Sequence, residues 1–293
     1  MEGAPFTVKG YYFLPFLDQS KIENHEVEKF EFRNGDVVVS GFPKSGNTWL
    51  VEVLKQMYGD WGLCHVGGAS EAIILEEHTV HKWFPGIRQK VVDINVAEDI
   101  PSPRLLRTHL PFPFFPMQKA LENGVKVIYI TRNPKDVCVS HYHFLKGFAQ
   151  GALQADWEGT LTNFVENRML SAPWIDHVDS WLGVDKNLMH VKYEDMKRDL
   201  PSVVQRIAEF LGRPVRTEDV ERTIRSTTID DMKKRFKELL ILDENLWEDG
   251  KSPFIRKGVT GDWKNHFTAA QSQVFDEKIG QRVKELSLDV DYQ

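Results

Sequence analysis

The chain has 293 residues, of which 41% are hydrophobic and 27% charged, and its formal net charge is −6. This composition predicts a globular protein, and we expect a single domain over residues 1–293 because no repeat or linker interrupts the chain. The negative charge disfavours binding to nucleic acid or to an anionic membrane surface, so a polyanionic ligand would need a few well-placed cations.

The alternation of apolar runs with amphipathic segments predicts the fold class. Strands are expected over residues 36–42, 103–111, 125–134 and 188–193, and helices over 43–58, 135–145 and 199–212. Gly212 is expected to end the last of these helices, and Thr268 to cap a helix near the C-terminus. We therefore predict a three-layer α/β fold around a parallel sheet, with ligands at the carboxyl ends of the strands.

The cysteines and the N-terminal residues indicate the cellular compartment of the protein. Cys64 and Cys138 have no paired spacing, which is typical of free thiols in a reducing environment. The first twenty residues lack the pattern of a secretory signal, and no apolar run reaches the length of a membrane span. We expect a cytoplasmic protein that does not associate with membranes.

Residues 41–49, GFPKSGNTW, form a turn between the first predicted strand and its helix. Small residues let backbone N–H groups converge on an anion there, and the helix N-terminus favours negative charge. Lys44 would add a full charge. Because lysine precedes the glycine, this is not the GxxxxGK[ST] loop of ATP-binding proteins. An ordinary glycine-containing turn is the alternative.

Two further groups of cations could hold phosphate. Arg132 lies near the end of the third predicted strand, just before a helix, a position suited to bidentate phosphate binding. The alternative is a surface arginine paired with Asp136. Near the C-terminus, Arg256 and Lys257 precede Gly258, so this segment is either a mobile phosphate clamp or a charged surface loop.

These segments resemble the cytosolic sulfotransferases. The likeness covers nearly the whole chain, in the order PKSGNTW, RTHLP, RNPKD, YED and RKGVTGDW. It implies an enzyme that transfers a sulfuryl group from 3′-phosphoadenosine 5′-phosphosulfate (PAPS) to a hydroxyl or amine of a small, phenolic or alcoholic acceptor. The second product would be adenosine 3′,5′-bisphosphate (PAP), and no metal is required.

The resemblance also implies which residues bind the nucleotide. These are Lys44, Ser45, Gly46, Asn47, Thr48, Trp49, Arg132, Ser140, Tyr193, Thr227, Thr228, Ile229, Met232, Phe254, Arg256, Lys257 and Gly258. Arg132, Ser140 and the RKG triplet would hold the 3′-phosphate, whose charge of about −1.5 to −2 is matched by the two arginines and the lysine. Trp49 and Tyr193 would flank the adenine, together with Thr227. Ile229 departs from the family, which has phenylalanine there.

By the same resemblance, His109 is the general base. Imidazole, with a pKa of about 6.5, can take the proton of the attacking hydroxyl. Lys44 would neutralise charge on the leaving oxygen, and Ser140 would hold Lys44 back until an acceptor arrives. Arg107 stands where the family has lysine and would contact the sulfuryl group, while Thr108 and Phe144 would border the acceptor.

Two other functions stay open. The departures at Arg107 and Ile229 favour a member that binds nucleotide without turnover, and a Mg²⁺-dependent phosphotransferase is the third hypothesis. The family's KxxxTVxxxE dimer motif is degraded in this sequence, because Ala269 and Gln273 replace valine and glutamate. We therefore expect either a weak homodimer or a monomer.

Overall fold

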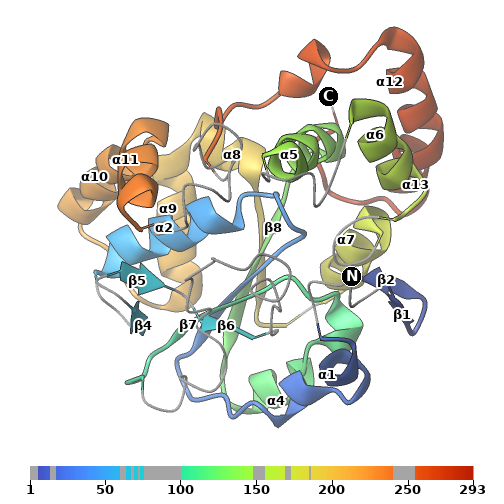
Figure 1. The fold of residues 1–293 in the computed structure, drawn as a ribbon. Coiled ribbons are helices and arrows are strands. Elements are labelled where there is room, and N and C mark those ends of the chain that lie inside the picture. Colours follow the sequence, from blue (N-terminus) through green and yellow to red (C-terminus); the bar gives the residue numbers. More distant parts are fainter. Residues whose placement is uncertain are drawn as a thin grey trace.

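A five-stranded parallel sheet forms the centre of the protein (Figure 1). The structure is a computed structural model and describes residues 6–13, 18–59, 64–66, 69–71, 73–75, 100–147, 156–168, 173–184, 186–239 and 255–292. The strand order is β6 (Ile73–Ile74), β7 (Leu105–Thr108), β3 (Val37–Ser40), β8 (Lys126–Thr131) and β9 (Leu188–Lys192). The four longer strands lie inside the four predicted segments.

The side chains of the sheet alternate between two hydrophobic cores. Val38 pairs in register with Leu106 and Val127, and all three face one core, whereas Val39 and Ile128 face the other. The first core is covered by α1 (Gln19–Glu23), α4 (Met117–Glu122) and α7 (Trp174–Leu182). The second is covered by α2 (Asn47–Tyr58), α8 (Tyr193–Arg198), α9 (Leu200–Leu211) and α10 (Thr217–Ser226). The predicted three-layer α/β fold is confirmed.

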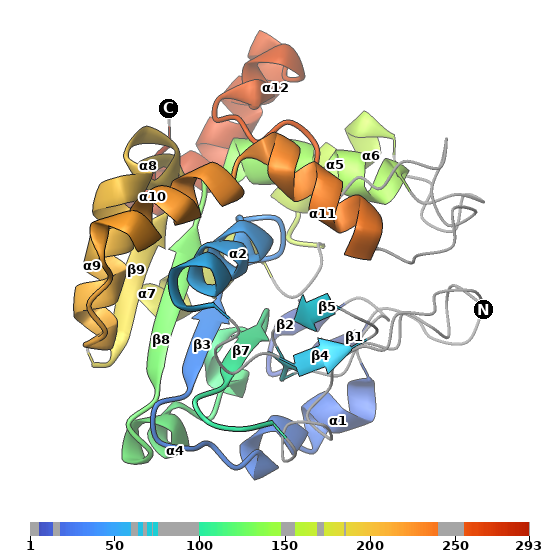
Figure 2. The same cartoon turned by 90° about the vertical axis from the view of Figure 1, so that its left-hand side faces the viewer.

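A third core lies beyond the carboxyl ends of the strands. It joins α5 (Pro134–Lys146), α6 (Trp157–Val165) and α12 (Ala269–Phe275), which continues through a π-helical turn, Asp276–Gly280, into α13 (Gln281–Glu285). Thr268 caps α12 in a capping box, and Gly212 ends α9 with a left-handed φ of 66°, as expected. Figure 2 shows α11 (Ile229–Leu239) beside α10, on the same side as α2.

The remaining elements are short. β1 (Phe6–Val8) and β2 (Tyr11–Phe13) form an antiparallel pair, as do β4 (Cys64–Val66) and β5 (Ala69–Glu71). The described residues also form 3₁₀ turns at Glu26–Lys29, Phe112–Phe114 and Asp262–Asn265. Within the described ranges, no helix has the length and apolar character needed to cross a membrane.

Candidate active site

The predicted site residues begin where the strands end. Gly41 follows β3, His109 follows β7, Arg132 follows β8 and Tyr193 follows β9. Because these strands are parallel neighbours, their carboxyl ends meet at one edge of the sheet. The fold thus brings together four motifs that are far apart in the sequence.

The loop after β3 adopts a tight conformation. Lys44 and Gly46 have left-handed φ angles of 71° and 109°, and the N–H of Ser45 donates to the carbonyl of Phe42. A Cβ at Gly46 would lie 2.7 Å from the Tyr193 ring, so only glycine fits there. The loop therefore curls against α8 and delivers the N-terminus of α2 to the site.

Asn47 braces this loop from within. Its side-chain amide donates to the carbonyls of Gly41 (3.3 Å) and Phe42 (3.0 Å), and the residue is buried. The sequence predicts that this residue binds the nucleotide. In the structure its amide nitrogen donates to the loop itself, and its Oδ1 has no hydrogen-bond partner among the described residues. Thr48 is half-buried at the start of α2.

Arg132 joins three segments of the chain. Its guanidinium donates to the carbonyls of Lys44 (3.4 Å) and Val259 (3.0 Å) and stacks 4.3 Å from the ring centroid of Tyr193. The alternative of a surface pair with Asp136 does not describe it, because Arg132 is 8% exposed and the nearest contact to Asp136 is 3.9 Å.

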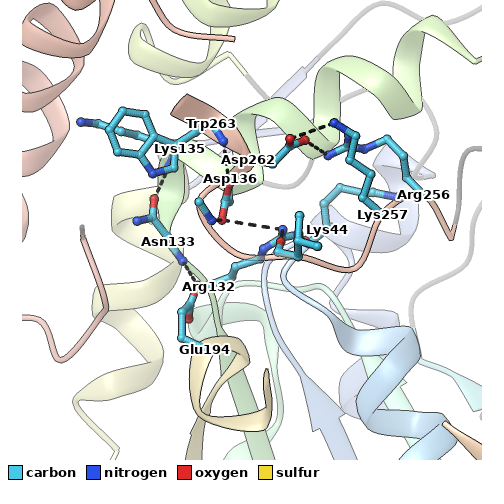
Figure 3. Close-up of polar contacts among 12 residues, drawn as sticks. Lys44, Arg132, Asn133, Lys135, Asp136, Glu194, Arg256, Lys257, Asp262 and Trp263 are labelled. Atoms are coloured by element: carbon cyan, nitrogen blue, oxygen red, sulfur yellow. Dashed lines mark hydrogen bonds and ion pairs between the residues drawn. The ribbon is translucent and has the colours of Figure 1, made fainter. Parts of the chain in front are cut away.

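Asp136 instead holds the C-terminal loop (Figure 3). Its two carboxylate oxygens accept hydrogen bonds from the backbone N–H groups of Gly261 (2.7 Å) and Trp263 (3.0 Å). The side chain is almost fully buried. The sequence indicated Asp136 only as a partner for Arg132, and this anchoring role was missed because the two partners are distant in the sequence.

The RKG segment carries its own counter-ion. Arg256 and Lys257 contact the carboxylate of Asp262 at 2.7 and 2.9 Å. Burial opposes ionisation of Asp262, but hydrogen bonds from Lys257 and Arg256 prevail and hold its pKa below the usual range. Gly258 has a φ of 63°, and a Cβ there would lie 2.7 Å from Cδ1 of Ile229, so Ile229 packs directly on this segment.

The cations lie close enough to influence one another. Burial lowers the pKa of Lys44 to about 7, and the charges of Arg132 and Arg256 act in the same direction. Four donor atoms of the predicted site are buried without a hydrogen-bond partner in the described part of the chain: Ser45 Oγ, Arg107 Nε, Arg132 Nε and Arg256 Nη1. Such donors are rare in folded proteins and suit an anionic ligand.

His109 is tied to the same loop. Its Nδ1 lies 2.7 Å from the carbonyl oxygen of Gly41, which can only accept, so Nδ1 carries the proton. In the neutral ring, Nε2 then holds the lone pair. Thr108 uses its hydroxyl locally, accepting from the N–H of Leu110 at 3.1 Å.

The Lys44 ammonium lies 4.2 Å from the ring centroid of Phe144 on α5. Ser140 precedes Phe144 by four residues, so both occupy the same face of this helix. The phosphate loop thus faces the part of α5 that carries both residues.

The residues assigned to the adenine pack against one another. Trp49 and Tyr193 meet edge to face with ring centroids 5.2 Å apart, and the indole N–H of Trp49 donates to the carbonyl of Thr227 at 3.1 Å. The Thr227 hydroxyl donates to the carbonyl of Thr223, and the Thr228 hydroxyl accepts from the N–H of Asp231. Met232 follows Thr228 by four residues and is buried. Phe254 lies outside the described residues.

A parallel α/β sheet with clustered cations and a phosphate loop at its carboxyl edge is typical of transferases that use phosphorylated nucleotides. Comparison with known proteins makes the class specific, because the sulfotransferase domain model matches residues 34–287. The chain belongs to the sulfotransferase family and is a sulfotransferase.

Curated relatives match over most of their length. Sulfotransferase 1B1 of Mus musculus is 32% identical over 287 residues, covering 96% of this chain and 93% of the relative. Sulfotransferase 1E1 of Cavia porcellus is 34% identical over 269 residues, covering 90% and 88%.

Solved structures of sulfotransferase-fold proteins superpose on this chain over most of its length. The mouse sulfotransferase SULT7A1 complexed with PAP is 28% identical, with a TM-score of 0.73 over 96% of this chain and 94% of that one. Retinol dehydratase, solved with retinol and PAP, shares the fold at 20% identity, with a TM-score of 0.79 over 100% and 93%.

Proposed function

We propose that this protein transfers a sulfuryl group from PAPS to a hydroxyl or amine of a small, phenolic or alcoholic acceptor, with His109 as general base. One observation supports the proposal most directly. The site contains four buried donor atoms without a hydrogen-bond partner in the described part of the chain, in Ser45, Arg107, Arg132 and Arg256. The loop that contains Ser45 also binds the ring of His109 through the carbonyl of Gly41. A PAP complex of the related mouse enzyme supports the choice of nucleotide.

The donor, when bound, supplies a sulfuryl group attached to a phosphate leaving group. Lys44 is the residue that would stabilise negative charge on the leaving oxygen, since it lies in the phosphate loop. Binding of a phosphate would favour its ammonium form, which the free protein holds only in part near pH 7. The 3′-phosphate would be held by Arg132, Ser140, Arg256, Lys257 and Gly258.

His109 would remove the proton from the acceptor. Its Nε2 lone pair accepts the proton as the acceptor oxygen bonds to sulfur and the bond from sulfur to the leaving oxygen breaks. Arg107 would contact the sulfuryl oxygens, and Thr108 and Phe144 would border the acceptor. Ser140 would restrain Lys44 before the acceptor arrives. Cytoplasmic location and the weak or absent dimer stay predictions.

The test is an acceptor panel of phenols, steroids and amines with radiolabelled PAPS. We expect turnover by the wild type, and His109→Ala to lose about 10²–10⁴-fold in kcat with its PAP affinity preserved. His25→Ala is a matched control, because His25 is also a half-buried histidine but directly precedes the 3₁₀ turn Glu26–Lys29, ahead of the sheet. Full activity of His109→Ala would refute the base assignment.

A binder without turnover is the second candidate. It is favoured by Arg107, which stands where the family has lysine and has an unpartnered Nε within the described structure. Tight PAP binding with no product from any acceptor of the panel would establish it. Restoration of turnover by Arg107→Lys would identify the residue responsible.

A further inference from the structure

The backbone that follows the proposed base is held by one helix. Residues 109–111 belong to neither a strand nor a helix. The carbonyl of His109 accepts from Nε2 of His177 at 3.1 Å, and the carbonyl of Leu110 accepts from the indole N–H of Trp181 at 3.0 Å. The N–H of Phe112 donates to the hydroxyl of Ser180 at 3.3 Å.

These three partners lie on one face of α7. Positions 177, 180 and 181 have the i, i+3, i+4 spacing that places side chains together on a helix. Backbone groups of a buried irregular segment must find partners, and here α7 provides them. The helix therefore determines where the backbone of His109 lies relative to the sheet.

His177 is itself oriented by the sheet. Because a carbonyl only accepts, His177 must donate through Nε2, so its Nδ1 is the acceptor in the neutral ring. The hydroxyl of Tyr129, in β8, lies 2.9 Å from this Nδ1 and fits as its donor. Burial raises the pKa of Tyr129 well above its usual value, which keeps the hydroxyl protonated. Both residues are fully buried.

His177 also contacts the other anchor of the base. The ring of Phe42 meets the His177 ring edge to face, with centroids 5.5 Å apart. Phe42 directly follows Gly41, whose carbonyl accepts from Nδ1 of His109. One side chain thus touches both the backbone of His109 and the segment that binds its ring.

We propose that His177, oriented by Tyr129, is the positioning residue of His109. It holds the backbone of His109 at the distance from Gly41 that the ring hydrogen bond requires, which leaves Nε2 as the basic nitrogen. His177 does not touch the substrate. This inference rests on the proposed function, because it assigns a role relative to His109 as base.

The experiment compares His177→Phe, His177→Gln and Tyr129→Phe with the wild type. We expect His177→Phe to lose about 10–100-fold in kcat, the scale on which small misplacements of a catalytic group act, with PAP affinity within about twofold. Glutamine can still donate, so His177→Gln should recover part of the loss. Tyr129→Phe keeps the ring and should lose less than His177→Phe.

Tyr58→Phe is the matched control. Its hydroxyl donates to the carbonyl of Arg213 at 3.1 Å, away from α7, so this variant should lose stability without losing kcat. If His177→Phe does not fold, the comparison of kcat between Tyr129→Phe and Tyr58→Phe tests the positioning role instead. Equal kcat in these two tyrosine variants, or a parallel loss of kcat and PAP affinity in His177→Phe, would overturn the proposal.

A second readout does not depend on turnover. Nitrogen-15 spectra of histidine-labelled protein report which ring nitrogen of His109 carries the proton. We expect the Nδ1–H form in the wild type and a mixture of forms in His177→Phe. An unchanged His109 signal overturns the positioning role while the base assignment stands, whereas an active His109→Ala overturns the base assignment on which that role rests.

Discussion

Asp136→Asn tests the junction between α5 and the C-terminal loop. The buried carboxylate accepts two backbone hydrogen bonds, at 2.7 Å from Gly261 and 3.0 Å from Trp263. Hydrogen bonds to charged groups contribute about 1.5–3 kcal/mol each. Asparagine can accept only one of them and turns an NH₂ group toward the other donor. We therefore expect a loss of about 2–4 kcal/mol in the free energy of unfolding.

Urea unfolding measures this loss, and titration with PAP measures its effect on the ligand site. Because the same loop carries Arg256 and Lys257, we expect PAP affinity to fall at least about tenfold, equivalent to about 1.4 kcal/mol. Asp195→Asn is the control, since Asp195 forms an exposed pair with Arg198 at 2.8 Å and should cost under about 1 kcal/mol. A loss as small as the control's, with unchanged PAP affinity, would refute the anchoring role.

Three further results are expected. PAP binding near pH 8 should take up a proton, because Lys44 has a pKa of about 7 in the free protein. Calorimetry in buffers of different ionisation enthalpy measures the proton uptake. The variant Lys44→Arg should abolish the uptake. Asn47→Ala should lower the free energy of unfolding by about 1–3 kcal/mol, because two loop carbonyls lose their amide donor; a neutral effect in denaturant would contradict the bracing role. Stability should fall as pH drops below about 6.5, because burial lowers the pKa of His141 to about 3 and the unfolded chain then binds the extra proton. The slope approaches about 1.4 kcal/mol per pH unit for this group, and a pH series on His141→Phe should be flatter.

Local sequence predicted the sheet and the placement of its motifs. Runs such as residues 127–131, VIYIT, are mostly apolar and β-branched, which specifies a buried strand without reference to the rest of the chain. Once the strands are parallel, Lys44, His109 and Arg132 must gather at their carboxyl edge. The positions of these three residues follow from topology alone.

The direction of individual side chains did not follow from the sequence. Asn47 sits in a motif whose small polar residues suggest ligand contacts, yet its amide nitrogen donates to carbonyls of its own loop. Asp262 forms ion pairs with both Arg256 and Lys257, and α7 supports the backbone of His109 through His177. Each of these depends on which partner comes within about 3 Å after packing, and periodicity carries no such information.

The contacts that unite the site join distant parts of the chain. Arg132 reaches Val259 across 127 positions, and Asp136 reaches Gly261 across 125. A polypeptide translated only as far as α11 contains all five strands but neither contact. PAP present during synthesis therefore has no complete pocket to stabilise until the loop that carries Val259 and Gly261 has emerged from the ribosome and reached Arg132 and Asp136.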